Sequence, residues 1–192
     1  GKTKKRRREE KKRRRTTTKT FKTTYVTNGK NNNEKAPVET TDTKTFKTTL
    51  QPKINELTNN YNDIIDKDWL PAWKEINTSG NSVDRDKLFV TMSAVSKQYE
   101  NIMNEIDTLK IKENISEVQI QEQLFYFTTE FKAASKFMKN AADLIIDGAK
   151  NSTLNSATIK NTKHALGLAD QHIVIALSTL TEVEEKLGLS KK

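Results

Sequence analysis

Apolar residues recur at spacings of three and four along most of the chain, and this rhythm constrains the fold more than any other feature. It begins with Phe46 and Leu50 and returns in three further stretches, separated by polar loops such as NTSGNS and DGAKNS. Because 3.6 residues complete a helical turn, each stretch places its apolar side chains on one face of a helix. The pattern predicts helices at about 44–77, 83–112, 117–148 and 156–187.

Amphipathic helices joined by short loops are typical of an up-down-up-down four-helix bundle. We therefore predict an all-α protein in which residues 44–192 form the bundle and residues 1–43 form a separate tail. The alternative, an extended coiled coil, requires longer uninterrupted stripes and more regular flanking charges. Small side chains concentrate in the third and fourth helices, which predicts that these two pack closest: Ala133, Ala134, Ala141, Ala142, Ala165, Ala169 and Ala176.

A proline interrupts the first predicted helix in the segment DWLPAW. Pro71 has no amide hydrogen for the carbonyl four residues back, and it disfavours helical geometry at Leu70. We therefore expect a kink or a break near Pro71, with Trp69 and Trp73 on either side of it.

The helix ends carry recognisable capping signals. Ser, Asn and Gln side chains satisfy the free amides at a helix start, and glycine readily adopts the left-handed conformation that follows a helix end. The candidates are Ser116 with Gln119 as a capping box before the third helix, Asn155 or Ser156 before the fourth, and Gly148 and Gly188 at the ends of the third and fourth.

The positive charge of the chain is confined to its start. The net charge is +9, and residues 1–20 hold twelve Lys or Arg against two Glu, a net of +10, so residues 21–192 sum to −1. Six of the seven arginines lie in this segment. Such a density of charge attracts a polyanion such as lipid headgroups, teichoic acid or nucleic acid. The candidate polyanion-binding residues are Lys4, Lys5, Arg6, Arg7, Arg8, Lys11, Lys12, Arg13, Arg14 and Arg15.

The segment 1–43 carries few large apolar side chains. It cannot bury enough surface to offset an ordering cost of roughly 1–2 kcal/mol per residue, so we predict a disordered tail and linker. The heptapeptide TKTFKTT occurs at 18–24 and again at 43–49, and only the second copy leads into an apolar stripe. Solenoid repeats need units of about 20–50 residues in at least three copies, so this pair predicts no repeat architecture.

Residue patterns for catalysis or for binding a metal or cofactor are scarce. The chain has no cysteine, which excludes disulfides, thiolate metal sites and a cysteine nucleophile. His164 and His172 lack the Glu-x-x-His pairs of di-iron bundles, so we expect solvated or partly packed histidines. Neither a glycine-rich phosphate loop nor a nucleophile elbow occurs. We predict a non-enzyme without catalytic residues, metal site or cofactor, and no stretch approaches the roughly 18 apolar residues of a membrane span.

Aromatic residues outside the apolar stripes suggest a surface for a protein partner. The segment QEQLFYFTTEF places Phe125 and Tyr126 beside the core stripe of the third helix. Together with Trp69 and Trp73 they form our candidate partner patch. The alternative is that a wider core face covers these side chains.

The layout of the chain resembles the mature part of small surface lipoproteins from low-GC Gram-positive bacteria. The shared features are a charged start, a Thr/Asn/Lys-rich spacer, no cysteine and a lysine-rich helical bundle. Gly1 at the start is explained by a cleaved tag or a removed leader, and the resemblance implies a lipid-bearing cysteine before it. It further implies that residues 2–43 are a tether and residues 44–192 a binding or scaffolding bundle.

The partners implied are an anionic membrane or cell-wall surface and another protein that binds the bundle. The alternative function is an intracellular, nucleic-acid-associated protein whose Lys/Arg tail binds phosphates. Salt-sensitive DNA binding without lipid modification would favour this alternative.

Overall fold

The computed structural model describes residues 39–189, and this part of the chain is helical apart from short turns, with no β-strand. The prediction of an all-α protein is confirmed. The elements in chain order are α2 (Thr41–Thr45), the π-helical turn η1 (Phe46–Leu50), α3 (Gln51–Ile64), the π-helical turn η2 (Ile65–Trp69), α4 (Leu70–Ser79), the 3₁₀ turn η3 (Gly80–Ser82), α5 (Arg85–Ile106), α6 (Ile111–Asn114), α7 (Val118–Asn151) and α8 (Ser156–Lys186).

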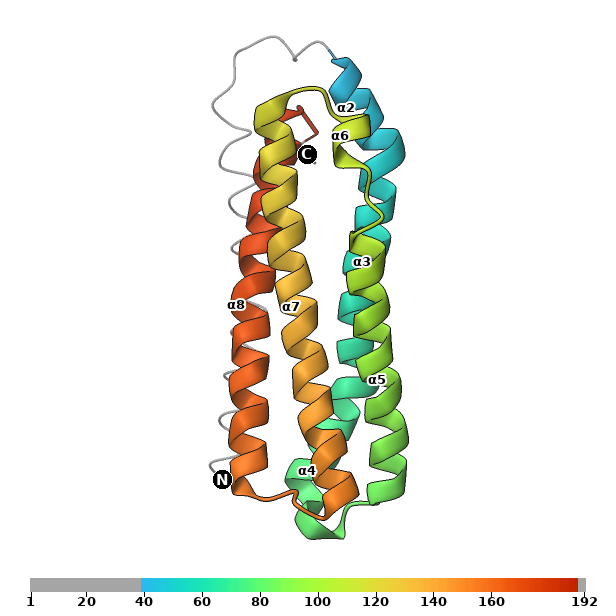
Figure 1. Cartoon of the computed structure of the whole chain (residues 1–192), viewed down its shortest axis with the longest axis vertical. Coiled ribbons are helices and arrows are strands. Elements are labelled where there is room, and N and C mark those ends of the chain that lie inside the picture. The colour runs from blue at the N-terminus through green and yellow to red at the C-terminus, as the bar shows by residue number, and fades with distance from the viewer. Residues whose placement is uncertain (1–38, 190–192) are drawn as a thin grey trace.

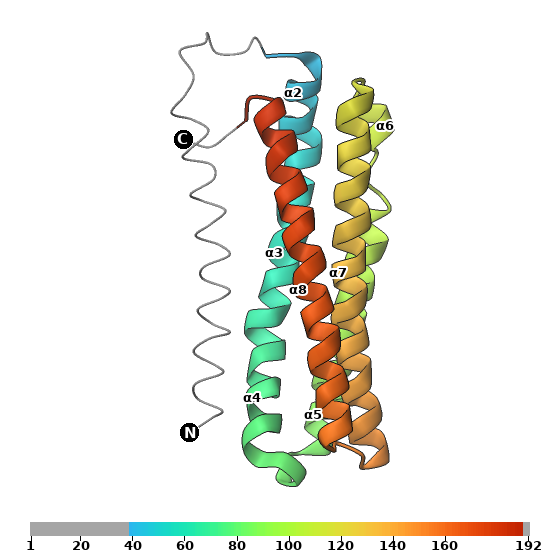
Figure 2. The ribbon, with the colours of Figure 1, turned by 90° about the vertical axis from the view of Figure 1, so that its left-hand side faces the viewer.

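The stretch from α2 to α4 lies beside α5, α7 and α8 along the long axis of the molecule (Figures 1 and 2). One end, which we call the α2 end, holds α2, α6, the start of α7 and the end of α8 (Figure 1). The other, the α4 end, holds α4, η3 and the loop between α7 and α8. The most extensive contacts between elements join α7 and α8. Ala134, Ala141, Ala169 and Ala176, four of the small side chains on this helix pair, are fully buried.

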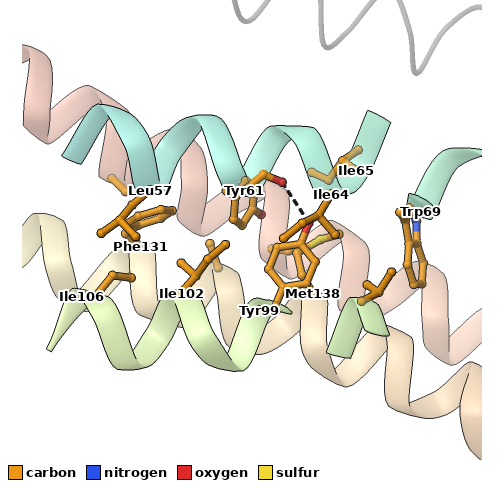
Figure 3. Close-up of a cluster of buried hydrophobic side chains, with 14 of the residues drawn as sticks. Leu57, Tyr61, Ile64, Ile65, Trp69, Tyr99, Ile102, Ile106, Phe131 and Met138 are labelled. Atoms are coloured by element: carbon orange, nitrogen blue, oxygen red, sulfur yellow. Dashed lines mark hydrogen bonds between the residues drawn. The ribbon is translucent and has the colours of Figure 1, made fainter. Parts of the chain in front are cut away.

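Three aromatic side chains from different helices meet in the core (Figure 3). The ring of Tyr61 on α3 lies 5.4 Å from that of Tyr99 on α5 and 5.8 Å from that of Phe131 on α7, measured between centroids. All three residues are at most 2 % exposed. The Tyr99 hydroxyl donates a hydrogen bond of 3.0 Å to the Tyr61 carbonyl. Each buried side chain of this size contributes roughly 1.5–3 kcal/mol, so this cluster fixes how the three helices sit against one another.

Within residues 39–189, the chain passes Pro52 and Pro71 without leaving helical geometry. Pro52 and Pro71 each follow a π-helical turn, in which the amides of Gln51 and Leu70 donate to carbonyls five residues back. A wider turn moves the preceding carbonyls away from the proline ring, which removes the clash of a regular helix. Leu70 keeps φ −62° and ψ −43°, so the expectation that Pro71 forces it out of the helical region is wrong.

The start of α7 is capped by a residue far away in the sequence. The Asp42 carboxylate on α2 accepts hydrogen bonds of 2.9 Å from the Ser116 amide, the Ser116 hydroxyl and the Glu117 amide. The N-cap residue of α7 is Glu117, which makes no side-chain cap of its own. The predicted capping box of Ser116 with Gln119 is therefore wrong, because a carboxylate from another helix satisfies the amides at this position.

Asp42 and Thr43, which our boundary assigned to the tail, belong to the helical body. Asp42 is 8 % exposed and Thr43 is 7 % exposed. The Thr43 hydroxyl donates a hydrogen bond of 3.0 Å to the carbonyl of Leu187, at the end of α8. The first and last helices of the described chain are thus joined at the α2 end.

The second predicted helix is shorter than expected. It ends at Ile106 instead of about residue 112, because the amides of Thr108 and Leu109 bond to carbonyls three residues back and tighten the chain into a turn. The separate short helix α6 follows, and Ile111 and Ile115 are buried. Buried apolar side chains therefore continue past the end of α5, but they lie on or next to α6 instead of on one continuous helix.

The helix α7 is longer than predicted and passes through Gly148. It ends at Asn151, and Ser152 takes the left-handed conformation with φ 57°. Gly148 serves packing instead: a Cβ there would lie 2.6 Å from Cδ2 of Leu154. The ends of α8 match the prediction. The Asn155 side chain accepts from the Thr158 amide at 3.0 Å, and Gly188 has φ 71°.

Candidate functional site

An open groove on the outer side of α7 and α8 is the main candidate for binding a partner. We call it the α7–α8 groove; it lies near the α2 end and has a volume of about 600 Å³. Tyr126 is 51 % exposed, and Val174 and Ile175 are each 38 % exposed. The lining residues are Gln119, Glu122, Gln123, Tyr126, Val174, Ile175, Ser178, Thr179, Glu182 and Lys186.

The rim of the α7–α8 groove carries more negative than positive charge. Glu122 and Glu182 face a single cation, Lys186. The ammonium group of Lys186 donates to the side-chain oxygen of Gln123 at 3.1 Å, and the amide of Gln123 donates to Glu182 at 3.4 Å. An apolar floor with an acidic rim suits an apolar side chain flanked by Lys or Arg.

The sequence analysis predicted the α7 side of this groove but missed the α8 side, although the sequence contains a signal for it. Tyr126 belongs to the predicted partner patch, and Phe125 beside it is 39 % exposed with the Lys112 ammonium 5.9 Å from its ring centroid. Val174 and Ile175 follow Ile173 in an uninterrupted apolar run. Because successive helical residues turn by about 100°, three such neighbours cannot all face the core.

The two tryptophans do not join Phe125 and Tyr126 in one patch. Trp69 is 2 % exposed, and its ring stacks on that of half-buried Trp73 at 6.0 Å between centroids. They lie next to and on α4, toward the opposite end of the molecule from the start of α7 (Figure 1). For Trp69 the alternative holds, since the core covers it.

The two histidines lie on α8 without a shared ligand site. His164 is exposed. His172 is half-buried, with its Nδ1 bonded to the Glu130 carboxylate at 2.5 Å and its ring stacked on that of Phe137. Within residues 39–189, no group of three or more His, Asp or Glu side chains is placed to hold a metal ion.

Asp42 is a buried carboxyl whose surroundings shift its pKa. Burial raises the pKa of its carboxyl. The hydrogen bonds from the Ser116 amide, the Glu117 amide and the Ser116 hydroxyl together lower that pKa by more than burial raises it, so the pKa of Asp42 lies below the usual 3.8. Three donors that stabilise the ionised form indicate a structural carboxylate rather than a proton donor.

The ten candidate polyanion-binding residues, from Lys4 to Arg15, lie outside the described residues. None of the helices in residues 39–189 has the length and apolar character needed to cross a bilayer. A scan against protein-family models, a search of curated proteins and a search of solved structures each gave no match for this chain.

Proposed function

We propose that this chain is a non-enzymatic interaction or scaffolding protein that works outside the cytoplasm, where its basic tail binds an anionic membrane or cell-wall surface and its helical body binds another protein. In this proposal the body is an up-down-up-down four-helix bundle, and the α7–α8 groove is its surface for the partner.

The separation of charge along the chain carries the proposal. Residues 1–38 hold fifteen Lys or Arg and three Asp or Glu, a net of +12, whereas residues 39–189 hold seventeen and twenty-two, a net of −5. An anionic surface therefore attracts the tail and repels the body. The attraction is worth about 1 kcal/mol for each Lys or Arg near the surface.

The geometry of the body supports a tethering role. The described chain begins at the α2 end (Figure 2). At this end the Thr43 hydroxyl donates a hydrogen bond to the Leu187 carbonyl, which connects the first and last helices. A body that is held by one end of its long axis extends away from the surface. Its side faces, including the α7–α8 groove, then remain accessible to a partner.

Flotation of the full chain with lipid vesicles tests the proposal. We expect binding to vesicles that contain anionic phosphatidylglycerol, none to pure phosphatidylcholine, and a steep loss of binding as salt is raised. Replacing the six tail arginines with Gln should weaken binding by at least about a hundredfold at roughly 1 kcal/mol each. The replaced residues are Arg6, Arg7, Arg8, Arg13, Arg14 and Arg15.

A matched control removes six positive charges from the exposed surface of the body. This variant has the same net charge as the tail variant, and we expect it to bind at least as well as the unchanged chain. Equal loss of binding in both variants would contradict the proposal, because net charge would then explain the result. The control replaces Lys47, Lys74, Lys87, Lys97, Lys150 and Lys160 with Gln.

The nucleic-acid alternative rests on the same arginines, because a guanidinium group binds phosphate in any setting. Adding duplex DNA to the flotation assay separates the two functions. If DNA at physiological salt displaces the chain from anionic vesicles at equal phosphate concentration, the tail is a nucleic-acid-binding segment and the surface function is wrong.

A further inference from the structure

We propose that the α7–α8 groove binds this chain's own segment Lys19–Val26, KTFKTTYV. The proposal stands on the lining of the groove and on the sequence of the segment. It is independent of the surface binding described under Proposed function.

The chemistry of the segment matches that of the groove. Phe21 and Tyr25 supply two large apolar side chains, and Lys19 and Lys22 flank Phe21. The groove offers Tyr126, Val174 and Ile175 as an apolar floor beneath a rim with excess carboxylate. Apolar anchors with flanking ammonium groups thus meet an apolar floor with acidic edges, which is the complementarity that sets register in protein interfaces.

The second copy of the same heptapeptide belongs to the body and packs with its phenylalanine in the core. In residues 43–49 the same seven letters place Phe46 fully within the core, and Leu50, four residues on, is 2 % exposed. Phe21 and Tyr25 have that spacing. The first copy has Thr17 where the second has Asp42, so it lacks the carboxylate that caps α7 and cannot take over that position.

The linker between the segment and the body is long enough for docking. Twelve residues separate Val26 from Glu39, and an extended chain of that length spans roughly 40 Å. The groove lies near the same end of the body: Ile175 is twelve residues from Leu187, which contacts Thr43, and twelve residues of helix rise about 18 Å. So short a tether gives a local concentration on the order of millimolar, at which weak contacts suffice.

Paramagnetic relaxation enhancement on the full chain tests whether the segment lies in the groove. The chain has no cysteine, so Thr27→Cys offers a single site for a nitroxide label next to the segment. We expect amide signals of residues 119–126 and 174–182 to be broadened. Signals near Asn161 and His164, toward the other end of the same helix pair, should remain sharp.

Variants separate docking from mere proximity. Phe21→Ser with Tyr25→Ser keeps the tether length and removes both anchors, and Ile175→Ser alters the floor; each should abolish the local broadening. Val90→Ser on α5, which replaces a 68 % exposed residue away from the groove, should leave it unchanged. Broadening that persists without the anchors, or that spreads evenly over the body, overturns the docking proposal.

A mixing experiment fixes the occupant of the groove. Nitroxide-labelled chain at natural isotope abundance is mixed with ¹⁵N-labelled chain that carries no nitroxide, and we expect no broadening of the ¹⁵N chain's signals. Broadening in this mixture would assign the groove to the segment of a second copy and overturn the intramolecular contact.

Discussion

Replacing Asp42 tests whether a carboxylate on α2 holds the start of α7 in place. Asp42→Ala removes the acceptor for the Ser116 amide, the Ser116 hydroxyl and the Glu117 amide. A hydrogen bond to a charged group is worth about 1.5–3 kcal/mol, and a helix cap about 0.5–2 kcal/mol. Because water can reach the free amides at this end, the three contributions do not add fully, and we expect a loss of about 2 kcal/mol. Asp42→Asn keeps one acceptor oxygen and should cost about half as much.

Urea unfolding followed by tryptophan fluorescence measures this loss. Trp69 is 2 % exposed and stacks on Trp73, so unfolding changes the surroundings of both rings. The midpoint should fall while the slope with denaturant stays constant, as expected for a change in stability alone. Glu39→Ala, which removes an exposed carboxylate three residues earlier, is the matched control and should change the midpoint little.

The pH dependence gives an independent check on the same residue. The pKa of Asp42 in the folded protein lies below its usual value of 3.8. Its contribution to stability is therefore complete above pH 3.8 and is lost as the pH falls through the lower pKa of the folded state. The difference between the unchanged chain and Asp42→Asn should stay constant from neutral pH down to about pH 3.8 and shrink below that pH. A loss below about 0.5 kcal/mol for Asp42→Ala at neutral pH, or a difference that does not depend on pH, would refute the capping role.

Three other substitutions have expected signs. Gly148→Ala should destabilise the protein by about 1 kcal/mol, because its Cβ would lie 2.6 Å from Leu154 Cδ2. Gly167→Ala on the same helix pair, with nothing within 4 Å of the new atom, should stabilise it by about 0.5–1 kcal/mol; the same sign for both in urea unfolding would contradict the packing role of Gly148. Tyr99→Phe should cost about 1–2 kcal/mol in that assay, because the Tyr61 carbonyl loses a buried donor, and an unchanged midpoint would show that this bond contributes nothing.

The helices were predictable because their apolar spacing is a local property. Phe46, Leu50, Ile54 and Leu57 follow one another at helical intervals, and all are buried. The cap of α7 was not predictable in this way, since it joins residues 74 positions apart in the sequence. The capping rule considers only neighbouring residues and therefore predicted Ser116. Asp42 reaches the start of α7 only because the fold brings α2 next to it.

The path through Pro71 shows a second limit of local rules. Proline is incompatible with the hydrogen-bond pattern of a regular helix, and the sequence rule therefore predicts an interruption. The π-helical turn η2 offers a different bond pattern, in which the Leu70 amide donates to the Ile65 carbonyl and Leu70 keeps helical geometry. Sequence position alone does not show which of the two solutions the chain adopts.

The exposure of the candidate partner patch was predicted only in part, because periodicity shows which residues turn outward and not which of them a neighbouring helix covers. Tyr126 stays accessible, whereas Trp69 is enclosed. The basic tail was recognised from composition alone, and it lies outside the described residues.

We propose that this chain works at an anionic surface outside the cytoplasm, and fractionation of the native host, with the protein followed by immunoblotting, tests this most directly. We expect to recover the protein from the surface fraction. Recovery from the cytoplasm together with bound nucleic acid would contradict the proposal.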